Sequence, residues 1–185
     1  MNSNRDLQVG DIGLYHGHNL VARGIQYFMR KYCNKYYKDS PPMIYNHAFI
    51  ILEDEHKIKR IADMNYKWTI RSVHDYNDTQ WTNDILILRP KVPYTHGEQN
   101  AMNILGKNYK ILTKYYQLVS WVQLAVYITF EVYIGFKGWI SHVRLFCSEA
   151  VGLITNWARK GTFKDTYKLM PMDIYYNDKF NKIKL

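Results

Sequence analysis

The chain has 185 residues, which suits one domain with a sizeable core. Hydrophobic residues make up 47%, charged residues 22% and aromatic residues 16% of the sequence, and this aromatic share excludes a disordered chain. The net charge of +9 fits three kinds of partner: nucleic acid, an anionic membrane surface, or an acidic polymer such as a cell-wall glycan. The densest cationic cluster lies at 30–38 among tyrosines, and we interpret it as a solvated helix face.

The cysteines and the N-terminal residues indicate the compartment. Cys33 and Cys147 are too few for a disulfide framework, so we expect free thiols in a reducing environment. Residues 1–10 are polar and contain no apolar segment of the kind that a secretory signal needs. We therefore expect a cytoplasmic protein, which would need another route of delivery if it acts outside the cell.

The first half of the chain predicts one helix and several strands, with no internal repeat or Gly/Ser linker. A short strand should end at Tyr15, and Asn19 can cap a helix to about Tyr36, whose apolar face begins at Val21. Apolar runs bounded by turns predict further strands at 48–52, 58–64, 69–73 and 85–89. Since no helix is expected between most of them, they indicate an antiparallel sheet.

Two segments in the second half need separate interpretation. A capping box at 95–98 opens a helix, and Gly106 stands where a C-cap glycine belongs. Residues 117–136 are apolar and long enough to span a bilayer, but they contain Glu131. A carboxylate near the bilayer centre costs about 3 kcal/mol or more, so a buried or peripheral helix is favoured over a span.

A last helix is expected from Cys147 to about residue 160, with Trp157 on its apolar face. The whole of 1–185 then predicts a single α+β domain: a small antiparallel sheet packed with helices. An apolar insertion at about 111–141 interrupts this domain.

Cys147 is the candidate nucleophile because it stands at the start of that helix. Unpaired N–H groups and the helix dipole favour a thiolate there and can bind an oxyanion. A small buried hydrophobe is the alternative interpretation. The thiol needs a base to take its proton. His47 stands at the start of an apolar strand, where a side chain is held rigidly yet stays accessible. His16 and His18 form an H-x-H pair, which is only a weak metal signal.

Asp63 is the candidate third member of the site. If the hairpin turn centres near residue 55, position 47 faces position 63, and facing residues have Cβ atoms about 5 Å apart. Asp63 could then accept a hydrogen bond from His47 and fix its tautomer. A slip of one residue would move Asp63 to the wrong face, and Glu53 and Asn46 are the substitutes.

The order of these motifs resembles a known superfamily. The residues that carry the resemblance are 10–12 (GDI), 46–50 (NHAFI), 61–63 (IAD), 106–109 (GKNY), 146–150 (FCSEA) and 170–173 (MPMD). They are similar to the circularly permuted branch of the NlpC-type papain-like superfamily, which includes the YiiX-like proteins and the lecithin:retinol acyltransferase group. In that branch the histidine precedes the cysteine. Lys110 departs from the pattern, since an acidic residue often follows the tyrosine of GKNY.

The resemblance implies a permuted papain-like fold with Cys147 as nucleophile, His47 as base and Asp63 as the polar third residue. It implies hydrolysis or transfer at an amide or ester carbonyl, and the chemistry requires no metal or organic cofactor. The expected substrate-binding residues are Tyr15, Asn46, Tyr109 and Ser148.

The favoured function is a cysteine peptidase or amidase acting on a peptide or acyl-amide, such as a cell-wall peptide. One alternative is a lipid acyltransferase or thioesterase that uses the same Cys–His pair and contacts the membrane through 117–136. The other is a non-catalytic basic module that binds a membrane or nucleic acid, although no nucleic-acid partner is expected of the enzyme.

Overall fold

The computed structural model describes residues 6–39, 41–65, 67–112, 147–166 and 168–184, with only the backbone of 65, 67 and 109–112. Most of the expected insertion at 111–141, and all of the apolar stretch 117–136, lie outside these residues. Within the described part of the chain, no helix is long and apolar enough to cross a membrane.

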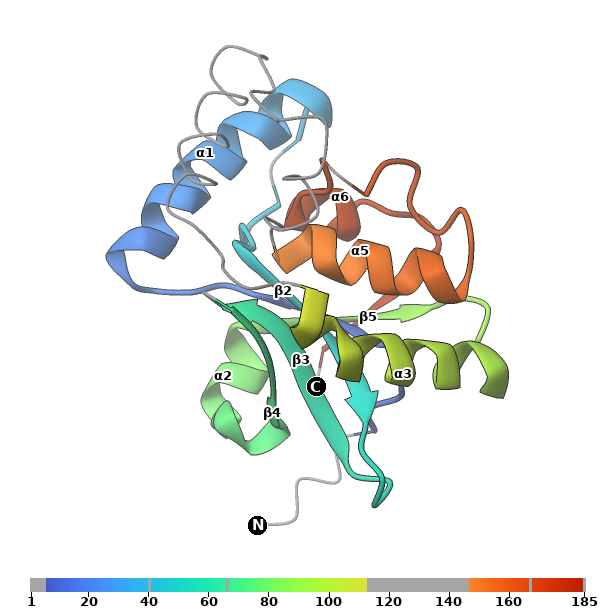
Figure 1. Cartoon of the computed structure of the whole chain (residues 1–185). Helices are drawn as coiled ribbons and strands as arrows, with labels where there is room; N and C mark the ends of the chain where they lie inside the picture. Colours follow the sequence, from blue (N-terminus) through green and yellow to red (C-terminus); the bar gives the residue numbers. More distant parts are fainter. Residues whose placement is uncertain (1–5, 40, 66, 113–146, 167, 185) are drawn as a thin grey trace.

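A six-stranded antiparallel sheet organises the fold, with the strand order β4-β3-β2-β1-β5-β6 (Figure 1). Its strands are β1 (Ile12–Tyr15), β2 (His47–Glu53), β3 (Lys59–Asn65), β4 (Lys67–Ser72), β5 (Ile85–Pro90) and β6 (Phe180–Ile183). β1 lies at the centre, with Tyr15 opposite both His47 on β2 and Ile85 on β5. The predicted α+β class with an antiparallel sheet is confirmed.

Helices cover the sheet unequally. They are α1 (Leu20–Tyr36), α2 (Asp78–Asn83), α3 (His96–Leu112), α5 (Cys147–Ala158) and α6 (Pro171–Tyr175), with a short 3-10 turn η1 (Val73–Asp75). Because side chains alternate along a strand, the sheet has two apolar faces. The larger core joins one face to α1, α3, α5 and α6. The smaller core lies on the other face, where Trp81 of α2 packs with Phe49.

The helix α1 begins as the sequence predicts, and its buried face differs from the predicted one in its first turn. Asn19 Oδ1 accepts a hydrogen bond from the Ala22 amide at 2.7 Å, which is the expected cap. The buried stripe passes through Ala22, Ile25 and Met29, one residue out of step with Val21, which is 60% exposed. The expectation that Val21 starts the apolar face is therefore wrong.

Gly106 does not end its helix, because α3 continues to Leu112. A Cβ at Gly106 would lie 2.2 Å from Leu52 Cδ1, so glycine lets α3 approach β2 closely. The Gly106 carbonyl also accepts a hydrogen bond from Trp68 Nε1 at 2.8 Å. The predicted C-cap is thus a packing glycine inside the helix.

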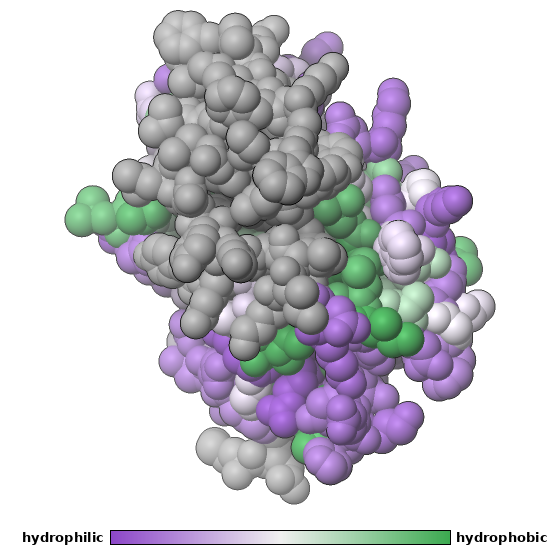
Figure 2. Space-filling model, viewed as in Figure 1, coloured by the Kyte–Doolittle hydropathy of each residue, from purple (hydrophilic) through white to green (hydrophobic). Residues whose placement is uncertain are grey.

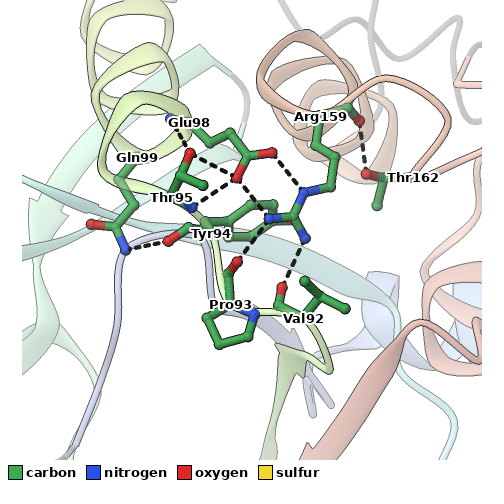
Figure 3. Close-up of polar contacts among 8 residues, drawn as sticks. All are labelled: Val92, Pro93, Tyr94, Thr95, Glu98, Gln99, Arg159 and Thr162. Carbon is green, nitrogen blue, oxygen red and sulfur yellow. Dashed lines mark hydrogen bonds and ion pairs between the residues drawn. The ribbon is translucent and has the colours of Figure 1, made fainter.

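Arg159, which directly follows α5, ties the end of that helix to the first turn of α3 (Figure 3). Its Nε and Nη2 donate to the two carboxylate oxygens of Glu98, each at 2.7 Å. Nη1 and Nη2 also donate to the carbonyls of Val92 and Pro93, at 2.8 and 2.9 Å. Thr95 and Glu98 form the predicted capping box. These bonds fix the position of α5 relative to α3.

Trp157, near the end of α5, is 72% exposed. The expectation that it lies on the buried face of this helix is therefore wrong.

Candidate active site

His47 and Asp63 are in contact, but not in the predicted register. Asp63 lies opposite Phe49, two residues from the predicted partner. Because the shift is even, both side chains still point to the same face of the sheet. The imidazole reaches diagonally across the strands, and its Nε2 lies 3.1 Å from Asp63 Oδ2.

Asp63 is fully buried and its carboxylate is held by three side chains. Besides His47, Thr69 Oγ1 donates to it at 2.8 Å and Arg71 Nη2 at 2.6 Å. Burial acts to raise the pKa of Asp63, but the hydrogen bond and charge of His47 and those of Arg71 outweigh it and lower the pKa to about 2. Asp63 is therefore an ionised, fixed acceptor across the physiological pH range.

Cys147 is the first residue of α5 and is only 4% exposed. Its side chain is within hydrogen-bonding reach of His47, whose side chain is 15% exposed. Since Nε2 of the ring faces Asp63, Nδ1 is the nitrogen left for the sulfur. The first N–H groups of an α-helix have no carbonyl partner within the helix, so the start of α5 can offer donors to a group bound beside Cys147.

The charge state of His47 follows from these contacts. Burial acts to lower the pKa of His47, since it opposes the charged ring. Negative charge on Cys147 and the hydrogen bonds to Asp63 and Cys147 outweigh burial and raise the pKa to about 10. The arrangement therefore favours the protonated, imidazolium form of His47 beside the ionised Asp63.

Tyr15 and Asn46, two expected substrate-binding residues, lie beside His47. Tyr15 is its cross-strand partner, and the Tyr15 hydroxyl accepts a hydrogen bond from Gln80 Nε2 at 3.3 Å. Asn46 Oδ1 accepts from the Gly17 amide at 2.7 Å and from Gln26 Nε2 at 3.2 Å. Asn46 thus fixes the loop that leads into α1, and its contact with substrate stays a prediction, as does that of Tyr15.

The other two expected substrate-binding residues lie on helices. Ser148 is fully buried, and its hydroxyl donates to the Leu169 carbonyl, so its side chain is committed to the protein interior. Only the Ser148 backbone N–H, in the first turn of α5, remains for a substrate. Tyr109 belongs to α3, but its side chain lies outside the described part of the structure.

Thr69 and Arg71 are site residues that sequence reasoning missed. They are two residues apart on β4, so they lie on one face of it, and Thr69 is directly opposite Asp63. Arg71 also donates to the Tyr76 hydroxyl at 2.8 Å and lies over the Tyr76 ring at 4.5 Å. The sequence does contain a signal that could have found them: Thr69 and Arg71 are polar residues two positions apart on the strand after Asp63. Residues with that spacing lie on the same face of a strand.

Replacing Arg71 with glutamine should lower the free energy of unfolding by about 2–4 kcal/mol, because the buried Asp63 charge loses the cation that donates its shortest hydrogen bond, at 2.6 Å. The Arg60→Gln variant is the control, since Arg60 pairs with the partly exposed Asp54 at 2.8 Å. We expect a clearly smaller loss there, because solvent screens that ion pair. Urea denaturation at neutral pH measures both, and equal losses would contradict the role assigned to Arg71.

Comparison with known proteins adds information about the fold. No family model matches the chain, and no curated protein matches it in sequence. The crystal structure of metalloprotein YiiX from Escherichia coli O157:H7 (DUF1105) matches with a TM-score of 0.53. The two chains are 10% identical, and the match covers 95% of this chain and 96% of that one. The chain therefore shares the fold of YiiX, in line with the YiiX-like architecture that the motif order implies.

The name of that neighbour raises the question of a metal. Across the described ranges, no group of three or more His, Cys, Asp or Glu side chains could hold a metal ion. In the H-x-H pair, His18 Nε2 contacts Asp84 Oδ1 at 2.9 Å, while His16 Nδ1 contacts the Ile44 carbonyl oxygen at 2.7 Å. The described residues do not fit a metal centre.

Proposed function

We propose that this protein is a cysteine hydrolase that cleaves an amide bond through a thioacyl-enzyme intermediate. One observation carries the proposal: a single imidazole contacts both the sulfur at the head of α5 and a buried carboxylate. A nucleophile, a proton carrier and a group that orients the carrier are the components of covalent acyl transfer.

In the proposed first half-reaction, the Cys147 thiolate attacks the carbonyl carbon and the C=O electron pair moves to oxygen. N–H groups in the first turn of α5 stabilise this oxyanion. As the oxyanion collapses, the C–N bond breaks and protonated His47 gives its Nδ1 proton to the leaving amine. The products are a free amine and a thioester on Cys147.

The second half-reaction returns the enzyme to its starting state. His47, now neutral, accepts a proton from water while the water oxygen attacks the thioester carbon. The C–S bond then breaks, which releases a carboxylic acid and the Cys147 thiolate. Asp63 holds the ring orientation throughout and favours the imidazolium, but it takes no proton.

The proposed substrate is a peptide or acyl-amide, including peptides of the cell wall. The excess of 25 Lys and Arg over 16 Asp and Glu supports a substrate that carries negative charge. Transfer of the acyl group to another acceptor in place of water would use the same pair of residues.

Alkylation by iodoacetamide tests the nucleophile without knowledge of the substrate. Cys33 is the internal control, because burial and then the Asp173 charge raise its pKa well above that of an ordinary thiol, to about 11. That change alone cuts its thiolate fraction about a hundredfold at neutral pH. Mass spectrometry should show Cys147 labelled at least about a hundredfold faster than Cys33, with the rate reduced by His47→Ala. Similar labelling of both thiols would refute the proposed activation.

A further inference from the structure

The outer face of α1 exposes large apolar side chains in a line. Leu20 is 88% exposed and Tyr27 is 58% exposed. They are seven residues apart, which is nearly two full helical turns, so they lie above one another along the helix. In Figure 2 a hydrophobic group projects from the edge of the molecule, where Figure 1 draws the first turn of α1. Such groups on a surface helix indicate contact with another molecule or a membrane.

Cations border this apolar line. Arg23 and Arg30 follow Leu20 and Tyr27 by three residues each, so they lie along one side of it. Lys31 lies over the line itself, with its Nζ 4.7 Å from the centre of the Tyr27 ring. All three cations are exposed, and α1 contains no aspartate or glutamate. The face therefore combines apolar and cationic groups with no acidic residue of the same helix.

The helix is held in place by its opposite face, so this outer surface is preformed. Ile25, Met29 and Cys33 are at most 7% exposed and belong to the main core. A partner that docks on the outer face need not supply the free energy of folding the helix.

We propose that α1 binds the surface of an anionic phospholipid bilayer, lying in the plane of the membrane with Leu20 and Tyr27 among the headgroups. Helices of this kind insert their apolar side chains at the headgroup boundary while their cations interact with anionic lipids. A nucleic acid would engage the cations but would leave Leu20 in water. The bilayer accounts for both parts of the surface, and the inference does not depend on the chemistry of Cys147.

Co-sedimentation of the full chain with vesicles tests this proposal. Vesicles of phosphatidylcholine containing about one third phosphatidylglycerol should bind at least about tenfold better than pure phosphatidylcholine, and high salt should remove the difference. Leu20→Asp should weaken binding at least about tenfold, because an apolar side chain is lost from the headgroup region. The triple variant R23Q/R30Q/K31Q should weaken it about a hundredfold, near fivefold per cation.

Matched controls lie on α3, where Ile104 is 63% exposed and Lys107 is also exposed. Ile104→Asp and Lys107→Gln should leave vesicle binding unchanged. An aspartate at position 20, the first residue of α1, suits a helix N-terminus, and circular dichroism checks that the fold is kept. Equal binding to neutral vesicles, or equal loss in the α3 variants, overturns the proposal. Loss of binding in the cation variant but not in Leu20→Asp, together with salt-sensitive binding of duplex DNA, assigns the face to nucleic acid instead.

Discussion

The Cys147→Ala variant is expected to lose at least about a thousandfold in kcat on any amide or ester that the wild-type protein cleaves, because no thioacyl intermediate can form. The substitution removes only a sulfur atom from a buried helix start, so the fold should persist. Turnover of a p-nitrophenyl ester or a peptide amide measures the loss, and a thermal melt measures the fold.

Cys33→Ala is the matched control for that variant. Cys33 is a buried residue inside α1, in the main core, and it takes no part in the proposed chemistry. We expect its activity to stay within about twofold of the wild type, with a modest decrease in the melting temperature. Turnover that survives in Cys147→Ala would end the proposal for this site.

Asp63→Asn is expected to lower kcat/KM by a factor between about a hundred and ten thousand, because an amide cannot stabilise the imidazolium and permits the wrong ring tautomer. Asp84→Asn removes a carboxylate from another His–Asp pair, in which the side chain of His18 is 61% exposed. That control variant should keep near wild-type activity, and equal losses in both would contradict the role of Asp63.

The pH dependence provides a second readout of Asp63. The contacts of His47 raise its pKa to about 10, so the imidazolium that protonates the leaving group is present at neutral pH and is lost as the pH rises through about 10. Removing the Asp63 anion lowers the pKa of His47. The alkaline decline of turnover should therefore move to lower pH in Asp63→Asn. An unchanged profile would show that Asp63 does not act through His47.

Membrane binding by α1 would favour substrates that are carried by lipids over soluble peptides. If the vesicle experiment succeeds, amides and esters carried by lipids come before soluble peptides, with the same Cys147 and His47 performing the acyl transfer. If it fails, soluble peptides keep their priority.

The sequence put Cys147 and His47 forward as candidates because both have a clear local signal. Cys147 precedes an amphipathic helix, and His47 precedes an apolar strand. Asp63 was placed on the correct face although the register was wrong by two residues, since only an odd shift reverses a face. The register itself was not predictable, because the 54–58 turn closes through Asp54, whose side chain accepts bonds from the His56 and Ile58 amides.

The helix α2 and the strand β6 are among the short elements that escaped prediction because their local signals are weak. The helix α2 has six residues, and it is held by a capping box at 77–80 and by the burial of Trp81. The strand β6 has four residues with only Phe180 buried, and it forms by pairing with β5. Short elements depend on tertiary contacts more than on propensity, so the sequence alone does not reveal them.

By itself the sequence determined the α+β class, the antiparallel hairpins and the residue types of the candidate site, because periodicity and helix-start signals act over a few neighbouring residues. The tertiary structure decided which side chains complete that site. Arg71 and Thr69 reach Asp63 only through the pairing of β3 with β4, and Ser148 turns to the Leu169 carbonyl only because the 168–170 segment packs against α5. The same packing left Leu20 and Tyr27 in solvent, since a helix buries the face that its neighbours can reach.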